Sequence, residues 1–303
     1  MPIIKANGIE LAYDVQGDLE GEPVLLIAGL GLQLISWPEK FCETLVKEGF
    51  RVIRFDNRDC GKSTKMSHFG KPNLHQAFFQ SLFRMPLFSG YTLYDMAKDA
   101  VGLMDGLGIQ KAHIVGASMG GMIAQIIAAR YPDRTHTLTS LMSTSGRPGL
   151  PGPTFAANSA MFSSPKNPRD FNAVVEHFVH LFRVIGSPGY PTPDALLRKR
   201  VIESVRRNAT INGTSRQMMA VASSGDLVAQ LRTIRLPSLV IHGTDDPLVP
   251  VACGRDTARW IPGAIMHEIE GMGHDLPPGL EEPIARLIAA HCRHELAPEA
   301  RQA

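Results

Sequence analysis

The sequence predicts an α/β fold in which a mostly parallel, doubly wound sheet is interrupted by a helical insertion after its sixth strand. Two observations lead to this fold. Short apolar segments alternate with amphipathic segments along the first half of the chain, and the same alternation returns near residue 236. Between these parts, a stretch rich in proline, glycine and serine carries helical patterns and no strand alternation.

The expected strands are short and strongly apolar. Two β-rich pieces lie within 2–15 and break at Asn7-Gly8, a hairpin signal. The run PVLLIAG at 23–29 is apolar almost throughout, as expected of a strand buried on both faces of a parallel sheet. The other strands are expected at 51–56, 112–118, 135–144, 236–243 and 264–271.

Amphipathic segments between these strands predict the covering helices. The segment 92–109 begins at Thr92 with Asp95 three residues later, a pattern typical of a capped helix start. The other helices of the α/β part are expected at 37–50, 119–132, 251–261 and 280–296. The predicted organisation is a first α/β part at 1–145, the insertion at 146–228 and a second α/β part at 229–303.

Composition limits the function classes. Hydrophobic residues make up 44% of the 303 residues and charged residues 20%, which is typical of a globular protein. The net charge of +2 predicts no nucleic-acid partner. The four cysteines show no CxxC spacing, so free thiols and no metal site are expected. Without an export signal or an apolar run of membrane length, we expect a cytoplasmic protein with no stable membrane insertion.

Residues 116–120 read Gly-Ala-Ser-Met-Gly and fit G-x-S-x-G at the junction of an expected strand and helix. A serine hydroxyl is a poor nucleophile, so it must project from a sharp turn towards a base. Such a turn crowds the backbone on both sides, which glycines two residues before and after the serine relieve. The context therefore predicts Ser118 as a nucleophile.

A serine nucleophile of this kind has an acid and then a histidine later in the chain. Asp245 and Asp246 follow the strand at 236–243, and His274 follows the strand at 264–271. The carboxyl ends of parallel strands share one edge of a sheet, so these side chains can converge on Ser118. His274 is predicted as the base, and either aspartate could orient it.

Acyl transfer also needs donors for the negative charge that develops on the carbonyl oxygen. One predicted donor is the backbone N–H of Met119, directly after the nucleophile. The second is the N–H of Leu30, in the loop after the strand at 23–29.

Several motifs together resemble those of the α/β-hydrolase fold serine esterases, closest to the aclacinomycin methylesterase-like branch. They are AGLG at 28–31 with a tryptophan shortly after, DNRDCGKS at 56–63, GASMGG at 116–121, HGTDDPLVP at 242–250 and GMGHDLP at 271–277. The resemblance covers nearly the whole chain. It implies that Asp246 is the acid, that the insertion is a cap and that the turn at 56–63 is structural. One departure is Ala28-Gly29, where many relatives carry His-Gly.

The predicted function is a serine hydrolase that cleaves carboxylic esters of small-molecule substrates, hydrophobic or methyl esters in particular, by a Ser-His-Asp triad through an acyl-enzyme. The same triad could serve a carbon–carbon bond hydrolase, amide cleavage, a perhydrolase or an acyltransferase, and the scaffold could be a catalytically silent ligand-binding protein. Homo-oligomerisation stays open. Large apolar side chains in the insertion could be ordinary core or line an apolar pocket, and the segment 75–88 could contact lipid.

No cofactor or metal is expected. Gly61-Lys62-Ser63 looks like the end of a phosphate-binding loop, but the position of its first glycine is Asp56. Gly29-Leu30-Gly31 lacks the third glycine of a dinucleotide fingerprint. His291 and His294 are interpreted as part of a solvated helix face and not as a metal site, because no acidic residue lies beside them as a further ligand.

Overall fold

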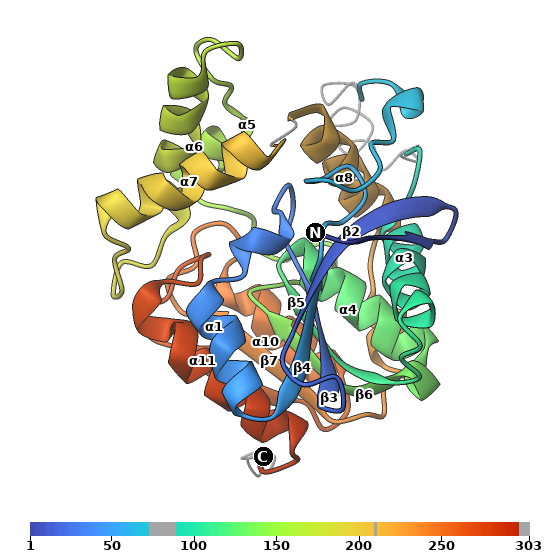
Figure 1. The fold of residues 1–303 in the computed structure, drawn as a ribbon. Helices are drawn as coiled ribbons and strands as arrows, with labels where there is room; N and C mark the ends of the chain where they lie inside the picture. The colour runs from blue at the N-terminus through green and yellow to red at the C-terminus, as the bar shows by residue number, and fades with distance from the viewer. Residues whose placement is uncertain (73–88, 209–210, 297–303) are drawn as a thin grey trace.

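The computed structural model describes residues 1–72, 89–208 and 211–296. Within these residues, eight strands form one sheet in the order β1-β2-β4-β3-β5-β6-β7-β8 (Figure 1). The strands are β1 (Ile3–Ala6), β2 (Ile9–Gln16), β3 (Glu22–Ile27), β4 (Phe50–Phe55), β5 (Ala112–Ala117), β6 (Thr135–Leu141), β7 (Ser238–Gly243) and β8 (Ile265–Ile269).

The sheet is mostly parallel, as predicted. β1 pairs with β2 and β2 with β4 in antiparallel fashion, and every further pair from β4 to β8 is parallel. β3 lies between β4 and β5, so the chain leaves β3 in one direction along the sheet and later returns past it. In open α/β sheets, such a reversal of strand order opens a crevice at the carboxyl ends of the strands.

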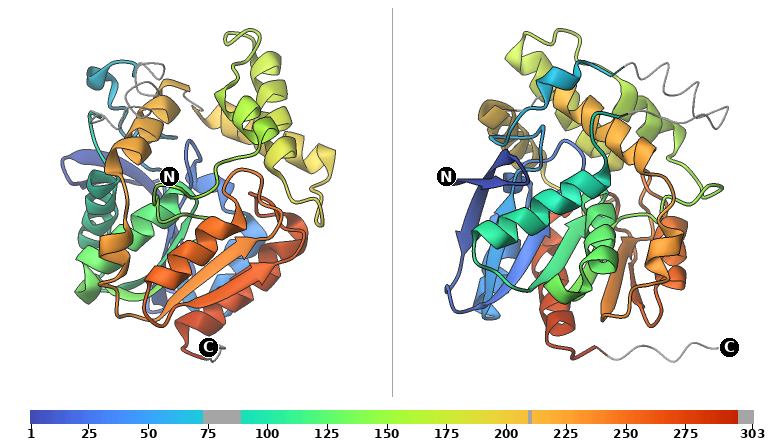
Figure 2. Two further views of the ribbon diagram at one scale, coloured as in Figure 1. Left: turned by 180° about the vertical axis from the view of Figure 1, so that it is seen from behind. Right: turned by 90° about the vertical axis from the view of Figure 1, so that its right-hand side faces the viewer.

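Helices cover both faces of the sheet. α1 and α11 pack against one face, and α3, α4, α9 and α10 lie on the other (Figures 1 and 2). Their bounds are α1 (Glu39–Lys47), α3 (Leu93–Gly106), α4 (Met119–Arg130), α9 (Val228–Leu231), α10 (Val251–Trp260) and α11 (Pro278–Cys292). Short 3₁₀ turns occur at η1 (Leu34–Ser36), η2 (Ser67–Phe69) and η3 (Pro132–Arg134).

The apolar strand runs are buried on both faces, as the sequence predicts. Leu25 of β3 belongs to the apolar cluster beneath α3 and α4, whereas its neighbour Leu26 belongs to the cluster beneath α1 and α11. Both side chains are almost inaccessible to solvent. Because alternate residues of a strand point to opposite faces, a central strand needs apolar residues at every position.

The predicted start of α3 is confirmed. The Thr92 hydroxyl accepts a hydrogen bond from the Asp95 N–H, and the Asp95 carboxylate accepts one from the Thr92 N–H at 2.9 Å. This reciprocal capping box satisfies two N–H groups that the helix start would otherwise leave unpaired.

The interpretation of His291 as a solvated helix residue is wrong. Its side chain is buried on α11, and its Nε2 lies 3.1 Å from the carbonyl oxygen of Leu138 in β6. α11 packs this side against the sheet, because its apolar residues occupy the same stripe of the helix. The helix also ends earlier than predicted, at Cys292.

The helical insertion lies between β6 and β7, as predicted, and contains α5 (Phe155–Phe162), α6 (Phe171–Ile185), α7 (Asp194–Asn208) and α8 (Ile211–Ser224). α5, α6 and α7 stand together at the top of the molecule, beyond the sheet (Figure 2). α6 and α7 share a small cluster of Val175, Val179 and Val201.

α8 packs differently from the rest of the insertion. Ala220 joins the apolar cluster beneath α3 and α4, and the Ser224 hydroxyl accepts a hydrogen bond of 2.9 Å from the N–H of Leu93 at the start of α3. The insertion therefore has one part that projects and one part that is docked on the α/β core. The domain limits at 145/146 and 228/229 stay a prediction.

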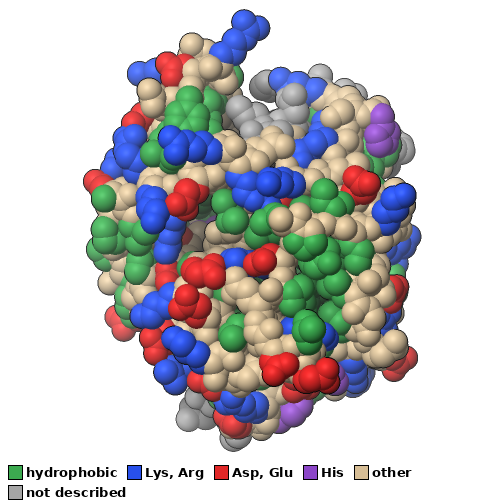
Figure 3. Space-filling view, viewed as in Figure 1, with side chains coloured by type: hydrophobic (Ala, Val, Ile, Leu, Met, Phe, Trp, Pro, Cys, Tyr) green, Lys and Arg blue, Asp and Glu red, His purple; other side chains and the backbone are tan. Residues whose placement is uncertain are grey.

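Basic and acidic side chains lie intermixed on much of the surface shown in Figure 3. Among the described residues, no helix is long and apolar enough to cross a membrane. The segment 75–88, for which the sequence leaves lipid contact open, lies outside the described residues.

Candidate active site

Ser118 lies between the end of β5 and the first residue of α4, in a strained backbone conformation with φ 55° and ψ −121°. L-amino acids rarely adopt this region, so the surrounding structure must hold the turn in place. The Ser118 N–H donates to the carbonyl oxygen of Leu141 at 2.9 Å, and the Ser143 hydroxyl donates to the Ser118 carbonyl oxygen at 2.7 Å. Both bonds come from the end of β6, which fixes the turn from the neighbouring strand.

Gly116 and Gly120, the two glycines of the motif, are required because neighbouring backbone atoms lie too close to them to leave room for a side chain. A Cβ atom on Gly116 would lie 2.0 Å from the carbonyl oxygen of Gly120, and one on Gly120 would lie 2.0 Å from that of Ile27. No side chain fits at such distances, because both neighbours are backbone atoms that cannot rotate away. The small residues around Ser118 thus allow α4 to begin directly against β3.

His274 lies between Ser118 and Asp246. Its Nε2 is 3.0 Å from the Ser118 Oγ, and its Nδ1 is 2.6 Å from the Asp246 Oδ2. The three residues follow β5, β7 and β8, whose carboxyl ends share one edge of the parallel sheet. This is the geometry in which an imidazole can accept the serine proton while the carboxylate holds its second nitrogen.

The Asp246 carboxylate is buried, and the protein supplies hydrogen bonds to its oxygen atoms. Its Oδ1 accepts hydrogen bonds from the N–H groups of Leu248 at 2.9 Å and Val249 at 2.8 Å. Burial by itself would raise the pKa of Asp246, but the charge of His274 and hydrogen bonds from His242, His274 and the backbone outweigh it and lower the pKa to about 2. The carboxylate is therefore ionised at neutral pH.

The neighbouring Asp245 has a different set of contacts. Its Oδ2 accepts hydrogen bonds from the Thr244 hydroxyl at 2.8 Å and from the N–H of Gly271 at 3.0 Å. These bonds tie the loop after β7 to the loop after β8. Of the two aspartates that the sequence leaves open, Asp246 is the one that contacts His274 in the described structure.

The end of α6 in the insertion supports the His274 loop. The His274 N–H donates to the carbonyl oxygen of Ile185 at 2.7 Å, and the Gly273 N–H donates to the Ser187 hydroxyl at 2.9 Å. The Ser187 hydroxyl in turn donates to the Asp275 carboxylate, whose pKa burial raises. No local sequence pattern indicates this role for Ser187, because about 90 residues separate it from the loop that it contacts.

The loop at residues 28–32, here called the oxyanion loop, lies against Ser118. A Cβ atom on Gly29 would be 3.3 Å from the Ser118 Cβ. None of the hydrogen bonds among the described residues uses the N–H of Leu30 or of Met119, the two predicted donors. The Asn57 side chain donates to the Ala28 carbonyl oxygen at 3.1 Å, at the site of the departure from His-Gly.

The turn at 56–63 connects the core to the insertion through two buried ion pairs. Asp56 pairs with Arg207 of α7 at 2.8 Å, and Asp59 pairs with Arg216 of α8 at 2.5 Å. Gly61 has φ 48°, and a Cβ atom there would collide with the Asp56 carboxylate. These contacts give the turn a structural role, and the Lys62 N–H donates to the Asp56 carboxylate at 2.8 Å. Neither arginine carries a local sequence signal for this role.

The large apolar residues of the insertion do not form one group. Phe155 and Phe162 on α5 are 89% and 59% exposed, so they are not core. Phe178 and Phe182 on α6 pack beside the small valine cluster, and Met219 on α8 is buried.

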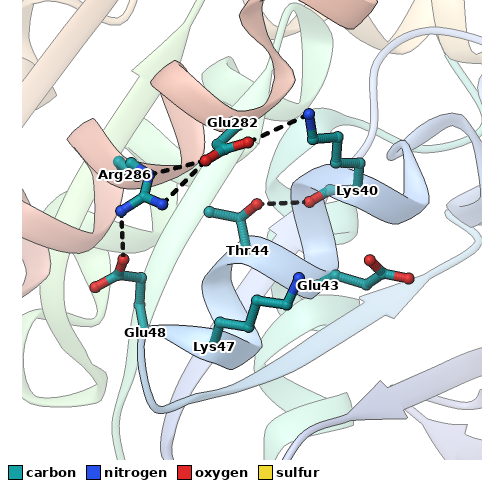
Figure 4. A pocket seen from close by; sticks show the side chains of 7 residues that line it. All are labelled: Lys40, Glu43, Thr44, Lys47, Glu48, Glu282 and Arg286. Carbon is teal, nitrogen blue, oxygen red and sulfur yellow. Dashed lines mark hydrogen bonds and ion pairs between the residues drawn. The ribbon is translucent and has the colours of Figure 1, made fainter.

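A hollow of about 380 Å³ lies between α1 and α11 and shares no residue with the Ser118 site (Figure 4). It is lined by charged side chains, and ion pairs such as Lys40–Glu282 cross it. These pairs join two helices on the same face of the sheet. Within the part of the chain that the structure describes, no group of three or more His, Cys, Asp or Glu residues is placed to hold a metal ion.

The sheet topology, the strained serine turn after β5 and the histidine after β8 form an arrangement typical of α/β hydrolases. A family model described as alpha/beta hydrolase fold matches residues 22–277. The chain belongs to this family.

The chain is 31% identical to rhodomycin D methylesterase DnrP of Streptomyces peucetius, over 96% of this chain and 97% of that protein. It is 27% identical to 2-hydroxymuconate semialdehyde hydrolase of Pseudomonas putida, over 94% and 91%. Among solved structures, a meta-cleavage product hydrolase of Pseudomonas fluorescens superimposes with a TM-score of 0.76 at 23% identity, covering 98% of each chain. The chain is an esterase of the methylesterase-like branch, as the sequence motifs predict.

Proposed function

We propose that the protein hydrolyses carboxylic esters through a Ser118–His274–Asp246 triad and an acyl-enzyme on Ser118. The observation that carries this proposal is the pair of contacts made by His274, 3.0 Å to the Ser118 Oγ and 2.6 Å to the Asp246 Oδ2. The strained backbone of Ser118 supports the proposal, because strained residues are common at active sites, where a side chain must be held in one orientation.

In the first step, the Ser118 Oγ attacks the ester carbonyl carbon while its proton passes to the His274 Nε2. The carbonyl oxygen becomes an oxyanion, which the N–H groups of Leu30 and Met119 bind. His274 then gives the proton to the departing alcohol, and the acyl group remains on Ser118. Water attacks this acyl-enzyme with the same proton transfers, which releases the acid and restores the serine.

Asp246 assists without losing its charge. With a pKa of about 2 the carboxylate is ionised, and it stabilises the imidazolium form of His274 that appears in each step. The hydrogen bonds from the Leu248 and Val249 N–H groups hold it in place, so the orientation of the imidazole is fixed before substrate arrives.

The proposed substrates are hydrophobic or methyl esters of small molecules, with the insertion acting as a cap over Ser118. The similarity to the rhodomycin D methylesterases over almost the whole chain supports methyl esters of bulky acids. Carbon–carbon bond hydrolysis is the second candidate, because 2-hydroxymuconate semialdehyde hydrolase is also similar over more than nine tenths of both chains.

The first experiment tests the nucleophile. A fluorophosphonate is expected to label the protein once per chain, at Ser118, as intact mass and peptide mapping can show. Ser118→Ala and His274→Ala should abolish labelling, whereas Ser164→Ala, at an exposed serine, and His267→Ala, at an exposed histidine, should not. Labelling elsewhere, or none, would overturn the catalytic assignment.

The second experiment tests the reaction. Initial rates are measured on p-nitrophenyl esters of increasing acyl length, on methyl esters of polycyclic acids and on vinylogous 1,5-diketones of the ring-cleavage type. Ester hydrolysis that depends on Ser118 supports the proposal. Turnover of the diketones alone would favour carbon–carbon bond hydrolysis by the same residues.

A further inference from the structure

Gln217 on α8 connects the insertion to the oxyanion loop. Its side chain is completely buried. The Oε1 atom accepts a hydrogen bond of 2.8 Å from the N–H of Gly31, and the Nε2 atom donates one of 2.8 Å to the carbonyl oxygen of Arg58. A single amide therefore holds two core loops from a helix that lies more than 150 residues further along the chain.

The contact with Gly31 acts on the peptide next to a proposed oxyanion donor. Leu30 directly precedes Gly31, and its N–H makes none of the described hydrogen bonds. Gly31 has φ 68°, and α8 lies so close that a Cβ atom there would be 2.7 Å from the Thr214 Oγ1. The bond to Gln217 holds the peptide between Leu30 and Gly31 in one orientation.

Other groups hold the same loop, but only Gln217 binds the Gly31 N–H among the described residues. The Cys60 thiol donates to the carbonyl oxygens of Gly31 and Leu32, and the Leu32 N–H donates to the Gly29 carbonyl oxygen. These bonds occupy the carbonyl groups of the loop. The Leu30 N–H lies in the same planar peptide as the Gly29 carbonyl, so the Leu32 bond helps to orient it, and Gln217 fixes the next peptide through the Gly31 N–H.

α8 is firmly attached, which makes Gln217 an effective support. Arg216, the preceding residue, forms the buried ion pair with Asp59, and Asp59 also accepts a hydrogen bond of 2.7 Å from the Tyr91 hydroxyl. At the C-terminal end of α8, Ser224 accepts a hydrogen bond from the N–H of Leu93. A side chain on a helix fixed at two points holds its partner more closely than one on a loop.

We propose that Gln217 is a positioning residue for ester hydrolysis, which aims the Leu30 N–H at the oxyanion by binding the N–H of Gly31. The proposal rests on the function proposed above. It makes α8 part of the machinery that stabilises the transition state, in addition to any role of the insertion in enclosing the substrate.

Gln217→Met tests the proposal, because methionine has a similar length and offers no comparable acceptor. Loss of one oxyanion donor typically lowers kcat by about 10²- to 10³-fold, so a misaimed donor should lower it by about 10- to 100-fold. We expect KM for a p-nitrophenyl ester to change by less than about threefold. Affinity for an alkyl boronic acid, which forms a tetrahedral adduct on the serine, should fall with kcat/KM.

Gln125→Met is the matched control. Gln125 is a buried glutamine on α4 that donates to the Ser140 hydroxyl at 3.0 Å, and among the described residues it forms no hydrogen bond with the oxyanion loop. It should lose stability by a similar amount and keep its kcat. If Gln217→Met loses stability but keeps kcat and boronate affinity, the residue is structural and the proposal is overturned.

Gln217→Glu gives a second readout. A neutral carboxyl group can accept from Gly31 and donate to Arg58, whereas a carboxylate can only accept and would repel the Arg58 carbonyl oxygen. The ratio of its kcat to that of the wild type should therefore rise as the pH falls from 8 to 5, and a ratio independent of pH would contradict the proposal. Failure of the proposed function would appear separately, as a wild type that neither hydrolyses esters nor is labelled at Ser118.

Discussion

Arg207 of α7 and Asp56 of the turn after β4 form a buried ion pair between the insertion and the core. The Arg207 Nη1 lies 3.0 Å from the Asp56 Oδ1 and its Nη2 lies 2.8 Å from the Oδ2, while Asp56 is completely buried. Asp56 also accepts a hydrogen bond of 2.8 Å from the Leu34 N–H, just beyond the oxyanion loop. The pair thus joins the projecting helices to the chain segment that approaches Ser118.

Removing one partner of this pair should be costly. Arg207→Met leaves the Asp56 carboxylate buried without its counter-charge, so we expect the free energy of unfolding to fall by about 3 kcal/mol. Urea denaturation measures it. Arg183→Met is the matched control, because the Arg183–Asp194 pair is exposed and should contribute less than about 1 kcal/mol. Equal losses in the two variants would contradict the prediction.

The two adjacent aspartates should differ sharply in their effect on catalysis. Asp246→Asn keeps the shape of the side chain but removes the charge that orients His274, and we expect kcat to fall by about three to four orders of magnitude. Asp245→Asn should change kcat by less than about tenfold, because Asp245 contacts Thr244 and Gly271 instead. Steady-state kinetics on one p-nitrophenyl ester measures kcat for both variants. A larger loss in Asp245→Asn would reverse the assignment.

Stability should fall in mild acid because of buried histidines. Burial lowers the pKa of His113 and of His291 to about 4, below the unfolded value of about 6.5. Above pH 6.5 both histidines are neutral in the folded and the unfolded chain, and their contribution to the free energy of unfolding is complete. As the pH falls from 6.5 towards 4, the histidines of the unfolded chain bind protons and those of the folded chain do not, so this contribution is lost. At pH 5, protonation of each histidine in the unfolded chain should have lowered the free energy of unfolding by about 2 kcal/mol.

Urea unfolding of the wild type and of His113→Gln between pH 7 and pH 5 measures this effect. The variant should show a shallower dependence of unfolding free energy on pH, whatever its stability at pH 7. His267→Gln, at an exposed histidine, serves as the control and should follow the wild type. Parallel curves for His113→Gln and the wild type would show that His113 does not contribute.

The glycines of the serine turn should tolerate no side chain. In Gly120→Ala the new Cβ atom would meet the Ile27 carbonyl oxygen at 2.0 Å, so α4 must shift and we expect a loss of more than about 3 kcal/mol. Gly152→Ala is the control, because nothing lies within 4 Å of a Cβ atom there. Thermal unfolding measures both, and a Gly120→Ala protein as stable as the control would be inconsistent with this geometry.

The sequence by itself determined the fold class, the candidate nucleophile and the candidate base. Strand burial, helix periodicity and a turn motif are local properties, so PVLLIAG, the Thr92 cap and Gly116–Gly120 could each be interpreted without knowing what packs against them. The parallel sheet then brings Ser118 and His274 to one edge, because parallel strands carry their carboxyl ends to the same side.

Tertiary structure alone decided the rest. Asp245 and Asp246 are chemically identical neighbours, and only their orientation shows which one contacts His274. The sequence predicts a solvated His291, whereas the packing of α11 against the sheet buries its side chain. Arg207, Arg216 and Gln217 act on partners more than 150 residues away. Contacts at such separations depend on how whole elements dock, which no local pattern of residues records.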